Sequence, residues 1–205
     1  MGPKVAVVDY DPAWPGLFEE EKARLARALA PYALSIEHIG STAVPGMASK
    51  PTIDIAVGLA RLADAPRCIE RMKALGYAYV PAFEAVLPER RYFRKGRTET
   101  DPATHQVHMV EVGSDFFDHD LLFRDWLRSH PEDAAAYAAL KRELAKKHAA
   151  DREAYTEAKT PFIHALKDKA REHRAKASDL RTGRGAGAAP PPPPPDAPRP
   201  PNSPP

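Results

Sequence analysis

The segment that runs from Gly40 to Asp54 combines a glycine, hydroxyl groups, a lysine and a carboxylate in an order that suits phosphate chemistry. A glycine lets backbone N–H groups approach a phosphate, the hydroxyls of Ser41 and Thr42 add donors, and Lys50 supplies a positive charge. A carboxylate placed early on a strand, as Asp54 is, binds a hard cation that bridges phosphate oxygens. The segment therefore predicts a phosphate site with Mg²⁺ held by Asp54.

Two simpler interpretations of this segment stay open. The glycines and prolines between residues 40 and 51 would shape a tight crossover, with Ser41 capping the turn that follows. Asp54 would then form an ion pair with Lys50 or with an arginine.

Three arginines on a later predicted strand form a second group of charged side chains. Side chains alternate between the two faces of a strand, so Arg90 and Arg94 share one face and Arg91 points from the other. The two guanidinium groups on one face suit a phosphate or carboxylate, which arginine binds through paired hydrogen bonds. A solvated hairpin is the alternative.

Histidines on the next predicted strand form a third group. His105 and His108 are three residues apart and point to opposite faces, so they cannot both bind one ion. Asp118, His119 and Asp120 follow that strand and offer a metal-hydrolase interpretation, although their spacing matches no zinc pattern. A partly buried, hydrogen-bonded histidine is the ordinary alternative.

Two pairs of residues on predicted helices are placed to close over a bound triphosphate. Arg124 and Arg128 are one turn apart, as are Tyr155 and Lys159, so each pair shares a helix face. The interpretation of both as ordinary surface pairs also stays open.

The elements that position these groups are strands first and helices second. Apolar patterns and turn residues predict strands at 4–9, 34–39, 52–59, 77–80, 86–94 and 104–112. They predict helices at about 12–30, 62–75, 121–128, 131–149 and 151–174. The first helix should bury Trp14, and Pro161 should kink or break the last helix near Lys159 and Thr160.

The composition is that of a soluble globular protein: of 205 residues, 43% are apolar and 28% charged, with a net charge of +2. This charge balance gives no indication of nucleic-acid binding, and no apolar run approaches the roughly 20 residues that cross a bilayer. A single cysteine, Cys68, and an N-terminus without a signal-peptide pattern predict a cytoplasmic location. Residues 178–205, rich in glycine and proline, are expected to form a disordered tail.

The layout of Gly40, Ser41 and Asp54 is that by which nucleotidyltransferases of the polymerase-β type bind a nucleoside triphosphate. Over about residues 4 to 170 the sequence also resembles the GrpB family. The motifs that carry this resemblance are DYDPAWP at 9–15, EHIGSTAVPG at 37–46, KPTIDI at 50–55, RRYF at 90–93, THQVH at 104–108, FRDWLRSHP at 123–131 and the segment 155–163. The resemblance implies a nucleotidyltransferase-like fold with a helical C-terminal part. GrpB-like domains also occur fused to dephospho-CoA kinase, which suggests a ligand related to coenzyme A.

The sequence departs from the nucleotidyltransferase pattern at Ala56. Active members of that superfamily carry a second acid two residues after the first, so one metal ligand is missing from this strand. Glu37, His108 or Glu111 on neighbouring strands would have to complete a one-metal site.

We therefore expect an α+β fold, with a nucleotidyltransferase-like mixed β-sheet, flanking helices and a C-terminal helical subdomain. The core would span residues 1–115, the helical subdomain 116–177 and the tail 178–205. The expected function is transfer of a nucleotidyl or phosphoryl group, with Mg²⁺, from a nucleoside triphosphate or another phosphorylated small molecule to a small acceptor. The expected site has three parts: catalytic Asp54, Ser41 and His108; phosphate-binding Gly40, Ser41, Thr42, Lys50, Arg90, Arg94 and Lys159; and metal-binding Asp54 and Glu37. The alternative is a non-catalytic domain that kept the fold and binds a phosphate-bearing ligand or a partner protein.

Overall fold

The computed structural model describes residues 4–96 and 103–182. Contacts divide the chain into two units, residues 1–171 and residues 172–205, and every candidate site residue lies in the first. The last helix, α5 (Arg152–Thr182), continues past the boundary at residue 177 that the sequence predicts. The rest of the predicted tail lies outside the described residues. No helix among those described is long and apolar enough to cross a membrane.

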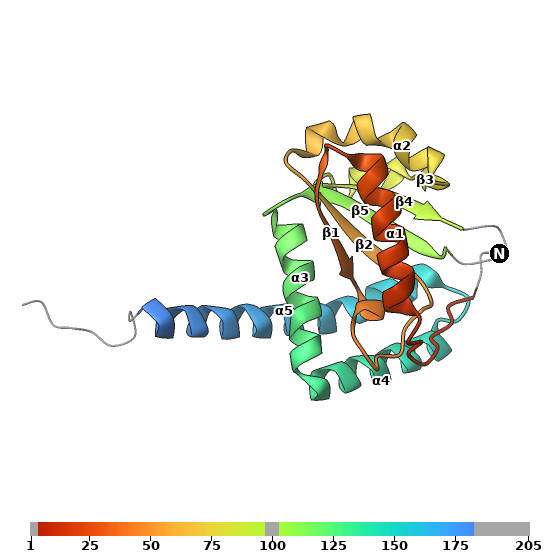
Figure 1. The fold of residues 1–205 in the computed structure, drawn as a ribbon. Coiled ribbons are helices and arrows are strands. Elements are labelled where there is room, and N and C mark those ends of the chain that lie inside the picture. The colour runs from red at the N-terminus through yellow and green to blue at the C-terminus, as the bar shows by residue number, and fades with distance from the viewer. Residues whose placement is uncertain (1–3, 97–102, 183–205) are drawn as a thin grey trace, which may run out of the picture. The chain divides into compact units, whose positions relative to one another are not determined.

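A five-stranded mixed sheet forms the centre of the first unit (Figure 1). Its strands are β1 (Ala33–Ile39), β2 (Ile53–Leu59), β3 (Tyr77–Tyr79), β4 (Arg90–Lys95) and β5 (His105–Glu111). Their order in the sheet is β1-β2-β5-β4-β3, and β2 and β5 are its parallel pair. The predicted α+β fold with a mixed sheet is thereby confirmed.

The predicted strand at residues 4–9 is wrong. This segment makes one isolated antiparallel bridge, between Val8 and Ser49. Pro51 lies two residues beyond Ser49 and has no N–H to donate, so the pairing cannot extend in that direction.

Helices cover both faces of the sheet (Figure 1). Contacts with the strands place α1 (Trp14–Leu29) and α2 (Ile69–Ala74) on one face and α3 (Asp115–Ser129) on the other. α4 (Pro131–Lys147) follows α3 and packs on it. The helix predicted at 62–75 begins instead as 3₁₀ turns at 62–68, because Pro66 lies inside it and removes a helical donor.

Two further helix boundaries differ from those predicted. α3 begins at Asp115 rather than residue 121, and the Ser114 hydroxyl caps it by accepting the Phe117 N–H at 3.4 Å. α5 runs through Pro161 as one helix, so of the predicted kink or break, the break does not occur. Leu166 and Ala170, beyond the proline, are buried, and this packing offsets the lost hydrogen bond.

The strand register divides the side chains between a core face and a site face. The core face carries fully buried residues such as Ile55, Val57, Phe93 and Val107, and Trp14 of α1, 3% exposed, packs in the same cluster, as predicted. The face toward α3 carries paired residues in three rows: Ile39, Asp54, Gln106 and Arg94; Glu37, Ala56, His108 and Tyr92; and Gly58, Val110 and Arg90. This second face holds most of the predicted site.

Candidate functional site

The loop between β1 and β2 begins with a glycine that packs against the carboxylate of Asp54. Gly40 has a φ of 70° and a ψ of −170°, a region that is essentially restricted to glycine. A Cβ atom at Gly40 would lie 2.7 Å from Oδ2 of Asp54 and 3.0 Å from its Cβ. The glycine is therefore required both by the turn and by the carboxylate beside it.

Positive side chains from the end of this loop and from α5 surround the Asp54 carboxylate. Lys50 comes from the loop, whereas Arg152 and Lys159 lie two turns apart on α5, and all three act on the carboxylate electrostatically. The ammonium nitrogens of Lys50 and Lys159 lie 5.6 Å and 5.3 Å from the ring centroid of Tyr155, which is buried. We call Asp54, Lys50, Arg152 and Lys159 the Asp54 cluster.

Burial dominates the ionisation of the Asp54 cluster. Burial raises the pKa of the Asp54 carboxyl, and the three cations around it offset only part of that rise. Burial, followed by repulsion from Lys159 and Arg152, lowers the pKa of Lys50 to about 8. Burial likewise lowers the pKa of Lys159. Several cations thus share one carboxylate in a poorly hydrated place, an arrangement that favours binding of a multivalent anion.

A glutamine that sequence analysis missed connects Asp54 to its neighbours. Gln106 pairs with Asp54 across the β2–β5 ladder and with Arg94 across the β4–β5 ladder. In the amide orientation that satisfies its surroundings, Nε2 donates to Oδ1 of Asp54 and to the Tyr92 hydroxyl, both at 3.2 Å, and Oε1 accepts from Arg152 at 2.9 Å. Its position two residues before His108, on the same strand face, was the available signal.

The two hydroxyl residues after Gly40 have different partners. The Ser41 side chain lies close enough to the Tyr137 hydroxyl of α4 to influence its pKa. The Thr42 hydroxyl is buried and contacts Nε2 of His38 at 3.0 Å and the carbonyl oxygen of Thr52 at 3.4 Å. The Thr42 side chain therefore stabilises the loop, which leaves its backbone for the predicted phosphate contact.

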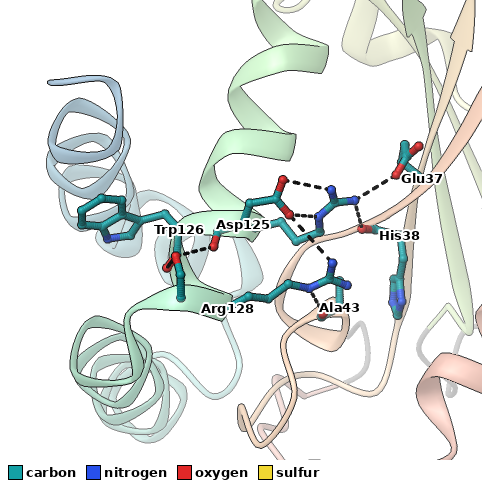
Figure 2. A network of polar contacts seen from close by, with 8 residues as sticks. Glu37, His38, Ala43, Asp125, Trp126 and Arg128 are labelled. Atoms are coloured by element: carbon teal, nitrogen blue, oxygen red, sulfur yellow. Dashed lines mark hydrogen bonds and ion pairs between the residues drawn. The ribbon is translucent and has the colours of Figure 1, made fainter. Parts of the chain in front are cut away.

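The arginine pair of α3 anchors the same loop (Figure 2). Nη1 of Arg124 donates to the carbonyl oxygen of His38 at 3.1 Å, and Nε of Arg128 donates to the carbonyl oxygen of Ala43 at 2.9 Å. Both arginines also contact the Asp125 carboxylate, at 2.7 Å and 3.8 Å. These bonds fix the start of the loop and explain the pair without a ligand.

Glu37 lies on the face that carries Asp54, but its carboxylate is already engaged. Oε1 accepts from the Ser35 hydroxyl at 3.0 Å, and Oε2 accepts from the first arginine of the α3 pair at 3.0 Å. Glu111, the other acid considered, accepts the Leu62 N–H at 3.0 Å.

Within residues 4–96 and 103–182, no three His, Cys, Asp or Glu side chains form a cluster that could hold a metal ion. Asp54 alone still fits Mg²⁺ that arrives with a phosphate ligand, because this ion commonly binds one or two carboxylates together with substrate phosphates.

Arg90 and Arg94 share one face of β4, as predicted, and the register shows that it is the face of Asp54. Arg91 points the other way, to a glutamate of the 81–85 turn. Nη1 of Arg90 lies 2.7 Å from Nδ1 of His108. Its guanidinium carbon lies 5.3–5.8 Å from the centroids of three rings: Phe83, Tyr92 and Phe116. Burial, followed by the charge of Arg90, lowers the pKa of His108 to about 3, so this histidine is neutral and accepts the bond. His108 thus orients Arg90 through Nδ1.

Two of the three residues of the metal-hydrolase interpretation are held by basic side chains. Asp120 pairs with Lys167 at 2.7 Å, and the His119 ring nitrogens lie 2.9–3.1 Å from the guanidinium of Arg171. His105 lies on the core side of β5, where Nδ1 contacts a threonine hydroxyl at 3.0 Å. No zinc-like ligand set forms among the described residues.

A cavity of about 420 Å³ lies beside the loop, between residues 44–47, the end of α3 and the start of α4. Its lining is mainly apolar, with Arg128 as the charged member. No residue of the Asp54 cluster lines it. This cavity is therefore separate from the charged site.

Comparisons with known proteins agree over most of the chain. A family model described as GrpB protein matches residues 4–169. UPF0157 protein YqkA of Bacillus subtilis is 39% identical over 168 residues, which cover 82% of this chain and 48% of that protein. A dephospho-CoA kinase of Mycolicibacterium paratuberculosis is 33% identical, covering 78% of this chain and 44% of that protein. The chain thus spans about half the length of these two relatives. The crystal structure of conserved protein GrpB from Enterococcus faecalis matches with a TM-score of 0.75 and 35% identity, covering 82% of this chain and 99% of that chain.

Proposed function

This chain belongs to the GrpB family, and we propose that it binds a phosphorylated small molecule, in the first place a nucleoside triphosphate, at the Asp54 cluster. The observation that carries this proposal is the excess of cations around one carboxylate. Lys50, Arg152 and Lys159 all act on Asp54, and repulsion among them contributes to the low pKa of Lys50. An anionic ligand would remove that repulsion and satisfy donors that water reaches poorly.

The charge balance favours a ligand with more than one phosphate group. A fourth basic side chain, Lys141 of α4, lies nearby: Lys159 and Lys50 help to lower its pKa, and Asp54 opposes that shift. A single phosphate ester carries about −1.5 to −2 charges at pH 7 and would leave this group partly unbalanced. A diphosphate or triphosphate chain would balance it.

Each member of the site has a separate role in this proposal. Lys50 and Lys159 bind phosphate oxygens as point charges, and the Arg152 guanidinium offers paired donors. Asp54 would hold Mg²⁺ together with phosphate oxygens, and the ion would neutralise charge on the phosphates. Gln106 keeps the Asp54 carboxylate and the Arg152 guanidinium in place from the adjacent strand.

Group transfer is the second candidate function, and the placement of Asp54 beside the Gly40 turn favours it. An acceptor hydroxyl would attack the α-phosphorus, forming a new P–O bond while the bond to the bridging oxygen breaks and pyrophosphate leaves; the hydroxyl proton passes to water. Ala56 stands where a second acid would bind metal, which favours the non-catalytic alternative. The relatives described as dephospho-CoA kinase are consistent with a nucleotide-like ligand related to coenzyme A.

Isothermal titration calorimetry with ATP and with inorganic tripolyphosphate, each in EDTA and in Mg²⁺, tests the binding proposal. Lys159→Gln should weaken binding more than tenfold, because a charge pair near a protein surface is worth up to about 4 kcal/mol at 4 Å. Lys169→Gln is the matched control: it removes the same charge from an exposed position of α5, where the lysine pairs with Asp133. Equal affinities for both variants would contradict the proposal.

Asp54→Asn separates the metal from the phosphate contacts. The amide keeps the size of the side chain but loses the charge that holds a divalent ion, so the gain in ATP affinity on adding Mg²⁺ should disappear. Binding in EDTA should persist, and a cooperative urea unfolding curve should show that the variant folds. An unchanged response to Mg²⁺ would remove Asp54 as the metal ligand and would leave binding without metal as the function.

A further inference from the structure

Lys141 of α4 is a buried lysine without a carboxylate partner. Its side chain is 2% exposed, its Nζ donates to the carbonyl oxygen of Ala48 at 2.6 Å, and it lies 4.6 Å from the ring centroid of Tyr137. Lys167, also poorly exposed, pairs by contrast with Asp120 at 2.7 Å. Among the described residues no acid lies within ion-pair distance of Lys141. Burying an ammonium group without an ion-pair partner costs free energy of folding.

The charged groups that act on Lys141 come from four parts of the fold. Lys159 on α5, Lys50 on the loop and Arg142 on α4 repel its ammonium, while Asp54 on β2 attracts it. Burial is the largest influence, and together these effects lower the pKa of Lys141 to about 7. Both protonation states are therefore populated near neutral pH.

α4 contacts the loop between β1 and β2 near both of its ends. Near the start, the Tyr137 hydroxyl lies close to Ser41. Near the end, Lys141 holds Ala48, two residues before Lys50. Tyr137 and Lys141 are one turn apart and share a helix face. The segment that brings Lys50 to the Asp54 cluster is thus fixed by α4.

We propose that Lys141 is a positioning residue for the phosphate site: its ammonium group holds the carbonyl of Ala48, fixes the segment that carries Lys50, and couples phosphate binding to protonation. This inference rests on the proposed function. A charged donor binds a carbonyl more strongly than a neutral amine does, so the segment is held best when Lys141 is protonated. A bound polyphosphate in turn attracts the ammonium and favours its protonated form.

Linkage gives the sign of the effect. If the ligand favours protonated Lys141, then binding near pH 7 takes up a proton from the solvent, about half a proton per site when the lysine begins half protonated. Affinity should therefore fall as the pH rises from 7 to 8. Lys50, with a pKa of about 8, is mostly protonated at pH 7 and contributes little to the uptake there.

The experiment is calorimetric titration of the full chain with inorganic tripolyphosphate in EDTA at pH 7, in buffers of different ionisation enthalpy, which yields both affinity and proton uptake. Lys141→Met keeps the length of the side chain and removes its charge. It should bind at least tenfold more weakly than the parent protein and take up about half a proton less per site, a difference from which the ligand's own protons cancel. Lys146→Met is the matched control, because it makes the same replacement at an exposed position of α4. Its affinity should stay within about twofold and its proton uptake should be retained.

The outcomes separate this inference from the function on which it rests. If the parent protein binds, Lys159→Gln weakens binding, and Lys141→Met matches the parent in affinity and proton uptake, the positioning role is wrong and the phosphate site stands. If the parent protein binds no tripolyphosphate, the proposed function and this inference both fall. If Lys141→Met does not fold, Lys141→Arg decides, because arginine keeps the charge but does not titrate near pH 7. Proton uptake equal to that of the parent protein would then overturn the coupling.

Discussion

Gly40→Ala should destabilise the protein and displace the carboxylate of Asp54. The backbone angles at Gly40 cost any other residue about 1–3 kcal/mol. The new Cβ would lie 2.7 Å from Oδ2 and 3.0 Å from Cβ of Asp54, and overpacking of this kind costs a further 1–3 kcal/mol or so. Alanine also restricts the unfolded chain, which offsets about 0.4–1 kcal/mol. The expected net loss is about 3 kcal/mol.

Urea unfolding of Gly40→Ala measures this loss, and Gly46→Ala provides a matched control in the same loop. Gly46 also has a positive φ, 75°, but a Cβ there meets no atom within 4 Å. Its replacement should therefore cost only about 1 kcal/mol, the backbone penalty less the unfolded-state offset. In an Asp54→Ala background the cost of Gly40→Ala should fall, because Oδ2 and Cγ are gone. Equal losses for the two glycine variants would refute the packing of Asp54 against the turn.

Three further predictions concern the frame around the site. Trp14→Ala should lower the free energy of unfolding by about 3–5 kcal/mol, as large aromatic truncations in cores do; near-parental stability would contradict its place in the core. Gly16→Ala should raise the unfolding free energy by about 0.5–1 kcal/mol, since the position is helical and open. Burial is the main cause that lowers the pKa of His38 to about 4 and that of His108 to about 3, so the unfolded chain takes up protons first as the pH falls below about 6.5. The stabilisation by the two neutral histidines is complete above pH 6.5 and is lost as the pH falls toward their pKa values in the folded protein. The free energy of unfolding should therefore fall by roughly 3–4 kcal/mol between pH 7 and pH 5. A midpoint of urea unfolding that does not change over that range would contradict the neutral, buried state of both rings.

Much of the fold could be predicted from local patterns. The β-branched stretch of β2 and the alternation in β5 specify strands, and Gly76, with a φ of 85°, ends the helical segment before β3 as predicted. Two of the errors arose at prolines. Pro66 converts a predicted α-helix into 3₁₀ turns, and packing beyond Pro161 carries α5 through a residue that locally forbids a helix.

The site was only partly predictable, because half of it comes from pairings that are distant in sequence. Asp54, Lys50 and Lys159 could be inferred from a motif and from charge. Strand alternation places Gln106 on the face of His108, but its contact with Asp54 depends on the parallel pairing of β2 with β5. Arg152 could not be inferred, because its relation to Asp54 depends on the packing of α5. Arg124 and Arg128 share a helix face, as the sequence indicates. The long-range contact of Arg124 is an ion pair with Glu37, which gives it a structural role in place of ligand binding.

The most direct test of the phosphate site is a crystal structure of the full chain with ATP-γ-S, a triphosphate that carries sulfur on its terminal phosphate. The anomalous signal of that sulfur locates the phosphate chain without prior assumptions. The proposed function predicts the sulfur among Lys50, Arg152 and Lys159, with the triphosphate between the loop and α5. A sulfur bound elsewhere, for example at Arg128 beside the apolar cavity, or no bound nucleotide at saturating concentration, would contradict it.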